Sequence, residues 1–152
     1  MGTLTVPLPD AAAAARYGAR LAGLMEKGDA VLLFGDLGAG KTTLARGAIH
    51  ALTGVADAPS PTFTLVQSYE APGGFLLTHA DLYRLEDEAE LEELGLDEAL
   101  DQGAALIEWP DRAPGFRPDD RLEIRLEERG AGRAALCEAF GRWEARLDRL
   151  AD

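Results

Sequence analysis

Short, wholly apolar runs alternate along this chain with longer stretches in which apolar residues recur at helical spacing. Residues 30–34 and 104–107 are apolar at every position, which is typical of strands buried on both faces. Residues 122–126 alternate apolar and charged side chains, so this strand is expected to leave one face in solvent. Further strands are predicted at residues 4–6, 63–69, 75–77 and 135–140, and helices at residues 11–27, 41–52, 86–101 and 143–150. This pattern predicts an α/β fold with a largely buried central sheet flanked by helices, in one compact domain over residues 1–152.

Local signals set the expected ends of these elements. Pro7 and Pro9 are expected to close the first strand, and Asp10 is a suitable N-cap for the helix that follows. That helix is expected to reach about Lys27, just before a Gly-Asp pair. Gly95 is expected to break the acidic helix in two.

The glycine-rich segment after residues 30–34 matches the phosphate-loop pattern G-x-x-x-x-G-K-[ST] at every fixed position. Its glycines let the backbone curl so that successive N–H groups face phosphate oxygens, and the following helix adds its positive end. Lys41 is expected to reach the β- and γ-phosphates, and the Thr42 hydroxyl to bind Mg²⁺. The residues of the loop are Gly35, Asp36, Leu37, Gly38, Ala39, Gly40, Lys41 and Thr42. The motif therefore predicts a P-loop NTPase fold.

Two acidic residues follow predicted buried strands. Asp81 comes after residues 75–80, as a Walker B aspartate follows its strand, and Glu108 comes directly after residues 104–107. Because ligands of open α/β sheets gather at the carboxyl ends of the strands, both side chains are expected to face the phosphate loop and bind Mg²⁺. For either residue alone, a surface carboxylate is the other interpretation.

Two prolines stiffen the segment at residues 59–63, which lies where GTPases keep a switch that senses the γ-phosphate. Thr62 could contact magnesium, the γ-phosphate or the attacking water, or the segment could be a rigid turn. The guanine-reading N-K-x-D motif and the L-S-G-G-Q signature are both missing, so ATP is the expected nucleotide.

Charge narrows the classes of partner. The 152 residues include 15 Lys and Arg against 27 Asp and Glu, a net charge of −12, which disfavours a free-standing DNA or RNA binder. Nine of the acids and no Lys or Arg lie at residues 85–101, either as a solvated helical face or as a docking surface for a basic partner. Without a long apolar segment and with Cys137 as the single cysteine, the chain is expected to be a soluble cytoplasmic protein that binds no membrane.

Four motifs occur together: GDLGAGKTT at residues 35–43, SPTF at 60–63, HADLYR at 79–84 and IEWP at 107–110. In their order and spacing, from about residue 10 to residue 112, the chain resembles the TsaE family, the small bacterial ATPases of tRNA threonylcarbamoyladenosine biosynthesis. The resemblance implies a compact P-loop fold and a weak Mg²⁺-dependent ATPase. It also implies that the protein binds the threonylcarbamoyl transferase subunits and that its ATP hydrolysis resets this complex between turnovers. The partners would hold the tRNA, so this acidic chain would meet it only indirectly.

The resemblance also implies roles for individual residues. Lys41, Thr42 and Thr43 belong to the nucleotide loop, Thr62 is the switch residue, and Asp81 and Glu108 are the magnesium-shell acids. Trp109 is expected to report on nucleotide occupancy. His79, Tyr83 and Arg84 fall within a family motif without an assigned role, and core packing is expected for Cys137 and Trp143.

Two other functions remain open from the sequence. One is a small-molecule kinase on the same fold, which needs an acceptor pocket and usually an arginine-bearing lid. The arginines of residues 113–152 are interleaved with acids, which indicates surface patterning and not a lid. The other is a nucleotide-dependent switch that binds ATP without needing hydrolysis.

Overall fold

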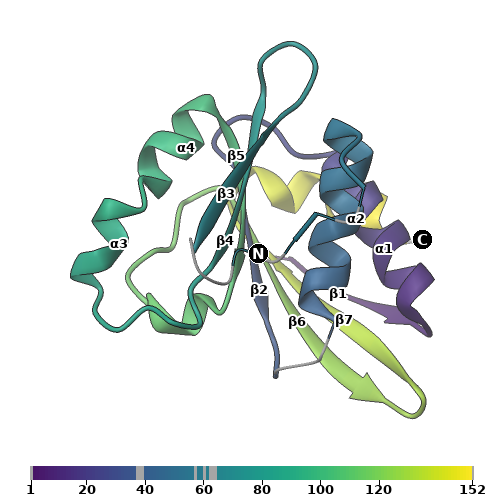
Figure 1. Cartoon of the computed structure of the whole chain (residues 1–152). Coiled ribbons are helices and arrows are strands. Elements are labelled where there is room, and N and C mark those ends of the chain that lie inside the picture. Colours follow the sequence, from purple (N-terminus) through teal and green to yellow (C-terminus); the bar gives the residue numbers. More distant parts are fainter. Residues whose placement is uncertain (1, 37–39, 57, 60, 62–64, 152) are drawn as a thin grey trace.

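The computed structural model describes residues 2–36, 40–56, 58–59, 61 and 65–151 (Figure 1). Their backbone forms one seven-stranded sheet in the order β1-β7-β6-β2-β5-β4-β3. The strands are β1 Gly2–Leu8, β2 Ala30–Phe34, β3 Val66–Glu70, β4 Leu76–Asp81, β5 Gly103–Glu108, β6 Arg121–Arg129 and β7 Gly132–Ala139. The α-helices are α1 Ala11–Ala22, α2 Lys41–Thr53, α3 Ala89–Glu93 and α4 Leu96–Gln102, and the 3-10 helices are η1 Pro110–Arg112, η2 Gly141–Ala145 and η3 Leu147–Leu150. The predicted α/β fold class is confirmed.

Parallel strands form the middle of the sheet, and antiparallel strands form its two sides. Strand β2 pairs in parallel with β5 and β6, and β4 pairs in parallel with β5. Strands β1 and β3 are the edges and pair antiparallel with β7 and β4. Because β2, β4 and β5 are parallel, their carboxyl ends lie at one border of the sheet, where Asp81 pairs in register with Glu108.

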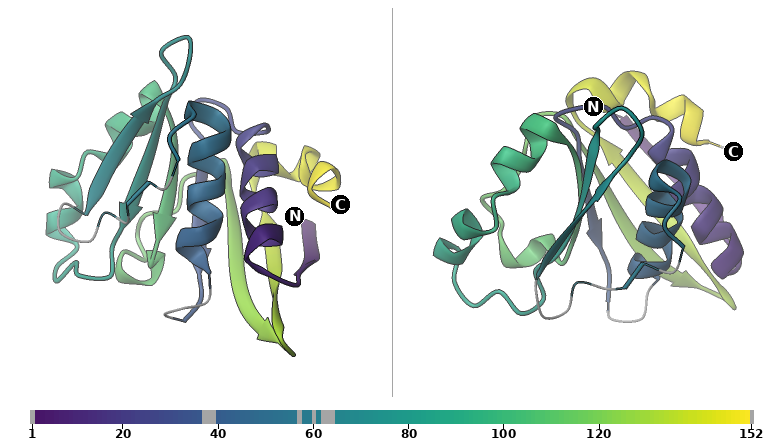
Figure 2. Two further views of the ribbon diagram at one scale, coloured as in Figure 1. Left: turned by 45° about the vertical axis from the view of Figure 1, so that its right-hand side comes forward. Right: turned by 45° about the horizontal axis from the view of Figure 1, so that its top comes forward.

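Helices cover the sheet on both faces, and each face has its own apolar core. Helices α1 and α2 lie side by side on one face, while α3, α4 and η1 lie over the other (Figures 1 and 2). Along β2, Val31 and Leu33 face the α1–α2 core, whereas Leu32 and Phe34 face the second core. This explains why the run at residues 30–34 is apolar throughout.

Close backbone contact joins α1 to α2. A Cβ atom added at Gly18 would lie 2.0 Å from the carbonyl oxygen of Leu44, and one added at Gly47 would lie 2.2 Å from that of Ala15. Any larger residue at either position would push the two helices apart. The packing of α2, which carries Lys41 and Thr42 at its start, therefore depends on these two glycines.

Several predicted boundaries were wrong. Helix α1 is capped by Asp10 as expected, but it ends at Ala22 and not near Lys27, because Gly23 weakens the helix and the Asp29 carboxylate accepts from the Glu26 N–H in a separate turn. Strand β1 continues through Pro7, which an edge strand accommodates because its outer side needs no N–H donor.

The other differences concern the ends of the chain's hairpins and its last segment. Strand β3 starts at Val66, after Leu65, whose φ of 65° is left-handed; residues 63 and 64 of the predicted strand lie outside the described residues. Residues 143–150 form the two short helices η2 and η3 in place of one α-helix, although Trp143 is fully buried as expected. Cys137 is also buried, and Gly95 breaks the acidic helix as predicted.

Among the described residues, no helix has the length and apolar character needed to span a bilayer.

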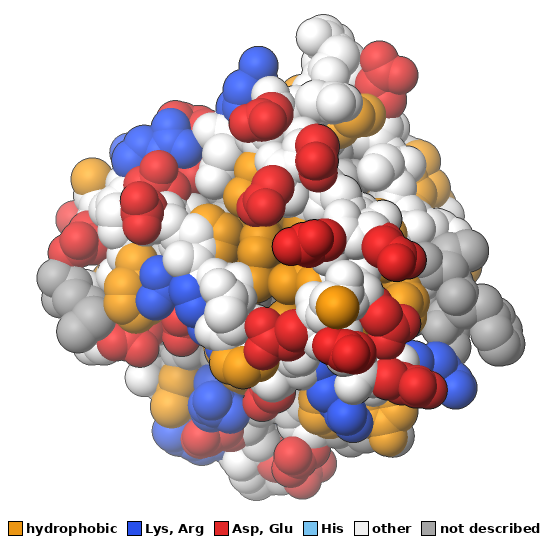
Figure 3. All heavy atoms as spheres, turned by 90° about the vertical axis from the view of Figure 1, so that its left-hand side faces the viewer, with side chains coloured by type: hydrophobic (Ala, Val, Ile, Leu, Met, Phe, Trp, Pro, Cys, Tyr) orange, Lys and Arg blue, Asp and Glu red, His pale blue; other side chains and the backbone are white. Residues whose placement is uncertain are grey.

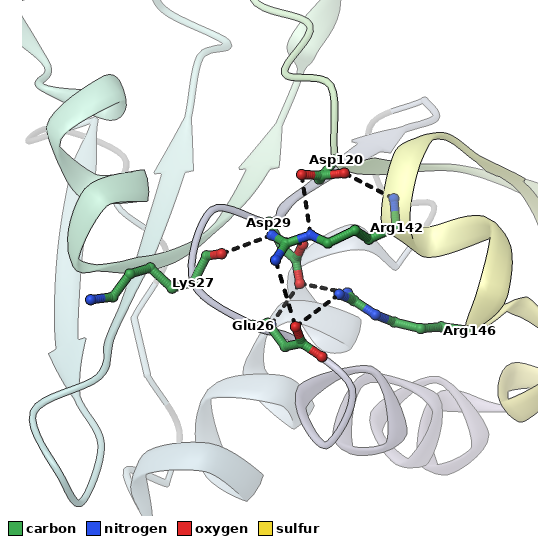
Figure 4. Close-up of polar contacts among 6 residues, drawn as sticks. All are labelled: Glu26, Lys27, Asp29, Asp120, Arg142 and Arg146. Carbon is green, nitrogen blue, oxygen red and sulfur yellow. Dashed lines mark hydrogen bonds and ion pairs between the residues drawn. The ribbon is translucent and has the colours of Figure 1, made fainter.

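The interpretation of the tail arginines as surface patterning was wrong for Arg146. Its guanidinium is buried and lies 2.6 Å from Oδ2 of Asp29, which is fully buried at the start of β2 (Figure 4). Arg142 lies 3.2 Å from Oδ1 of the same aspartate and 3.1 Å from Asp120. Glu26 completes the cluster at 3.2 Å from Arg146. These ion pairs join η2, the turn before β2 and the segment before β6.

Replacing Arg146 with methionine would leave the buried Asp29 carboxylate without its closest partner. We expect Arg146→Met to lower the free energy of unfolding by about 3–5 kcal/mol, the usual cost of breaking a buried ion pair on one side. Urea unfolding followed by circular dichroism measures the change. Arg149→Met, at an exposed position of η3, is the control and should change stability by less than about 0.5 kcal/mol. Equal stability of the two variants would contradict this account.

Candidate nucleotide site

The phosphate loop connects the end of β2 to the start of α2. Gly35 follows the strand with φ of 140°, and Gly40 caps the helix with φ of 98°, both values that favour glycine. The predicted strand–loop–helix context is therefore present. Leu37, Gly38 and Ala39 of the loop lie outside the described residues, as does the predicted switch residue Thr62.

Lys41 is the buried cation of this loop, with 5% of its surface exposed. Its Nζ donates hydrogen bonds to the carbonyl oxygens of Gly35 at 2.5 Å and Asp36 at 3.1 Å. Burial lowers the pKa of Lys41, and the nearby carboxylates, Glu108 foremost, oppose that shift. An ammonium held on two neutral carbonyl groups can exchange them for phosphate oxygens, which carry charge and bind it more strongly.

Glu108 lies at the centre of the site, at the end of β5, with 2% of its surface exposed. The Thr42 hydroxyl donates to its two carboxylate oxygens, at 3.1 Å and 3.3 Å. Nε2 of His79 lies 2.6 Å from Oε2 and donates to it, since a carboxylate only accepts. A buried carboxylate is thus held by groups from α2 and β4.

Asp81 ends β4 beside Glu108 and is only partly buried. Burial raises the pKa of Asp81, and the charge of Glu108 adds to the increase, while a hydrogen bond of 3.0 Å from the Tyr83 N–H opposes it. The sheet thereby brings together Thr42, Asp81 and Glu108, the three residues predicted to bind a metal.

This donor set suits Mg²⁺, which prefers oxygen ligands and is usually held by one or two carboxylates, a hydroxyl and substrate phosphates. Within the described part of the chain, no three His, Cys, Asp or Glu side chains gather as a metal cage.

His79 is a site residue that the motifs left without an assigned role. It is fully buried in β4, and its contact with Glu108 fixes the orientation of that carboxylate. One signal could have found it: His79 stands two positions before Asp81 in a strand, so both side chains lie on the same face of the sheet. The partner of the histidine, 29 positions further along, could not be read from the motif.

The ring of Trp109 packs against the Lys41 ammonium group. The lysine Nζ lies 4.1 Å from the centroid of the indole ring, and the ring centroids of Trp109 and Tyr83 are 4.9 Å apart. Trp109 has a left-handed φ of 57°, a conformation that non-glycine residues seldom adopt outside functional sites. The Arg112 guanidinium lies over the Tyr83 ring, 5.5 Å from its centroid. Two adjacent rings, Trp109 and Tyr83, thus lie between the cations Lys41 and Arg112.

Trp109 is expected to respond to nucleotide because phosphate would draw Lys41 away from its ring. Adding ATP and Mg²⁺ should change the tryptophan emission of the protein. In Trp109→Phe, the remaining tryptophan is Trp143, which is fully buried in the other core, so emission should persist without the nucleotide response. A response of unchanged size in Trp109→Phe would show that the signal arises elsewhere.

His79 is expected to act through Glu108. We expect His79→Leu to lower Mg²⁺-dependent ATP turnover about 10- to 100-fold, the usual effect of removing the partner of a metal-binding residue. His79→Gln, whose amide can place a donor near the former Nε2 position, should keep most of the turnover and serves as the matched control. Turnover across a series of Mg²⁺ concentrations is the measurement. Equal losses in both variants would point to a packing role alone.

Comparisons with known proteins show which family this chain resembles. Residues 8–135 match the family model described as threonylcarbamoyl adenosine biosynthesis protein TsaE. The chain is 37% identical over 133 residues to the tRNA threonylcarbamoyladenosine biosynthesis protein TsaE of Haemophilus influenzae, covering 84% of each chain. It is 42% identical over 110 residues to the protein of the same name from Bacillus subtilis, covering 72% of this chain and 68% of that one.

A solved structure extends the likeness to the whole fold. The crystal structure of YdiB from Bacillus subtilis superposes with a TM-score of 0.81 at 31% sequence identity, covering 98% of this chain and 94% of the other. The phosphate loop, the paired acids at the ends of β4 and β5, and the family model that spans most of the chain lead to the same assignment. The chain belongs to the TsaE family.

Proposed function

We propose that this protein binds ATP with Mg²⁺ at the border of the sheet, hydrolyses it slowly, and serves tRNA threonylcarbamoyladenosine biosynthesis. Its partners are the threonylcarbamoyl transferase subunits, and hydrolysis resets their complex between turnovers. The observation that carries the proposal is the convergence of Lys41, Thr42 and Glu108 at one point of the sheet. Its family relatives are described as biosynthesis proteins for this modification.

The residues of the site divide the work between binding and charge. Lys41 would exchange the carbonyl groups of the loop for phosphate oxygens, and the Thr42 hydroxyl would be a ligand of the metal. Asp81 and Glu108 would hold the cation, with His79 orienting Glu108. Bound Mg²⁺ would neutralise the phosphate charge that develops during transfer.

The groups at the phosphate loop support slow hydrolysis by the chain alone. Phosphoryl transfer needs positioning and stabilisation of charge more than covalent chemistry, and Lys41 supplies one such charge. Partners that supply a further cation or fix the position of the switch residue Thr62 could raise the rate about a thousandfold or more, as an arginine finger does in other NTPases. The acidity of the chain favours tRNA that is held by the partners.

The positions of two arginines in the C-terminal segment argue against the kinase alternative. Arg142 and Arg146 bind Asp29, which precedes β2, whereas the phosphate loop follows the other end of that strand. These two arginines therefore cannot close over the phosphates as a lid.

ATP turnover by the purified protein, alone and with the transferase subunits, tests the proposal. We expect slow turnover alone, strong stimulation by the subunits, and loss of both in Lys41→Ala. Turnover that ignores the subunits would contradict the proposed role, and a labelled phosphoryl acceptor would then favour the kinase. Full support of tRNA modification by Asp81→Asn without hydrolysis would favour the nucleotide switch.

A further inference from the structure

A groove opens on the face of the molecule opposite α1 and α2. It has a volume of about 340 Å³ and lies between α3, α4 and the segment that follows η1. Figure 3 shows apolar side chains in the middle of this face, with acidic side chains around much of them. The residues that line the groove are Leu91, Glu92, Leu96, Asp97, Glu98 and Phe116.

The floor of the groove is apolar and its rim is acidic. Leu96 and Phe116 belong to the second core, and Leu91 packs against that core while still partly exposed. Of the six lining residues, three are acids and none is basic. A helical face that is only solvated needs no apolar groove. The interpretation of residues 85–101 as a solvated face therefore does not explain the groove, whereas a docking surface does.

The rim acids are free to meet a partner. Glu92, Asp97 and Glu98 form no ion pair with any described residue. Arg117, which follows Phe116 of the floor, donates to the carbonyl groups of Ala113 and Phe116 and pairs with Glu123. Within the described part of the chain, the charge of the three rim acids is therefore not neutralised by an ion pair.

Both sides of the groove are connected to the nucleotide site. On one side, residues 82–85 lead from Asp81 toward α3, and both Leu82 and Leu85 are buried in the second core. On the other side, Glu108 is followed by Trp109, η1 and then Phe116. Anything seated in the groove would press on the chain segments that position Asp81 and Glu108.

We propose that the groove receives a basic segment of a partner protein. The segment places one or two apolar side chains on the floor formed by Leu91, Leu96 and Phe116, and sets lysines or arginines against the acidic rim. Apolar anchors supply affinity, while complementary charge selects the partner and speeds association. The proposal rests on the proposed function, because the transferase subunits are where this segment is to be sought.

Paired charge reversals test the groove on the full-length protein. In Glu92→Lys/Glu98→Lys, both changes fall on the rim; in Glu93→Lys/Asp101→Lys, the same two helices receive the same charge at exposed positions outside the lining. Affinity for the purified transferase subunits is measured by calorimetry in the presence of ATP and Mg²⁺. We expect the rim pair to weaken binding about tenfold or more and the matched pair to weaken it less than about threefold. Leu91→Gln, which changes the apolar floor without changing the charge, should also weaken binding.

The outcomes separate the two proposals. Equal weakening by both pairs would show general electrostatic attraction and overturn the groove as a docking site, as would unchanged binding by the rim pair and Leu91→Gln. Failure of the wild-type protein to bind the subunits would overturn the proposed function and the groove's role within it. The ATP turnover of each variant alone should equal that of the wild type, which checks that the nucleotide site is intact.

Discussion

A carboxylate buried beneath a phosphate loop must be compensated by donors at short range, because an uncompensated buried charge costs several kcal/mol. Glu108 meets this requirement with the hydroxyl of Thr42 and the ring of His79, which come from α2 and β4. Helix α2, strand β4 and strand β5 therefore have to lie in one relative position for the site to be stable. The glycines that let α2 approach α1 and the parallel register of β4 with β5 provide that position.

The charged residues at the two ends of β2 are neutralised to different degrees. At the start of the strand, Asp29 is permanently paired with Arg146 and Arg142, which anchors the last segment of the chain. At the far end, Lys41 rests on uncharged carbonyl groups and can be drawn away by an anion. The ion pairs of Asp29 stabilise the fold. The end of β2 next to Lys41 is its carboxyl end, where open α/β sheets bind their ligands.

The acidic part of the chain extends this arrangement outward. The segment that leaves Asp81 leads to the groove wall, and the segment that leaves Glu108 leads to its floor. A partner seated there would contact segments that adjoin the two acids along the chain. The proposed nucleotide site and the proposed docking surface are therefore neighbours along the chain.

The sequence by itself determined the fold class, the phosphate loop and the pairing of Asp81 with Glu108, because each rests on local patterns: apolar runs, glycine spacing, and an acid at the end of a buried strand. It also predicted that Trp143 is buried, since apolar spacing reports burial. It could not predict the role of His79 or the burial of Arg146, whose partners lie 29 and 117 positions away. A charged or polar side chain is predicted to lie on the surface unless its partner is known. Only the tertiary structure shows that partner, because the two residues are far apart in the sequence.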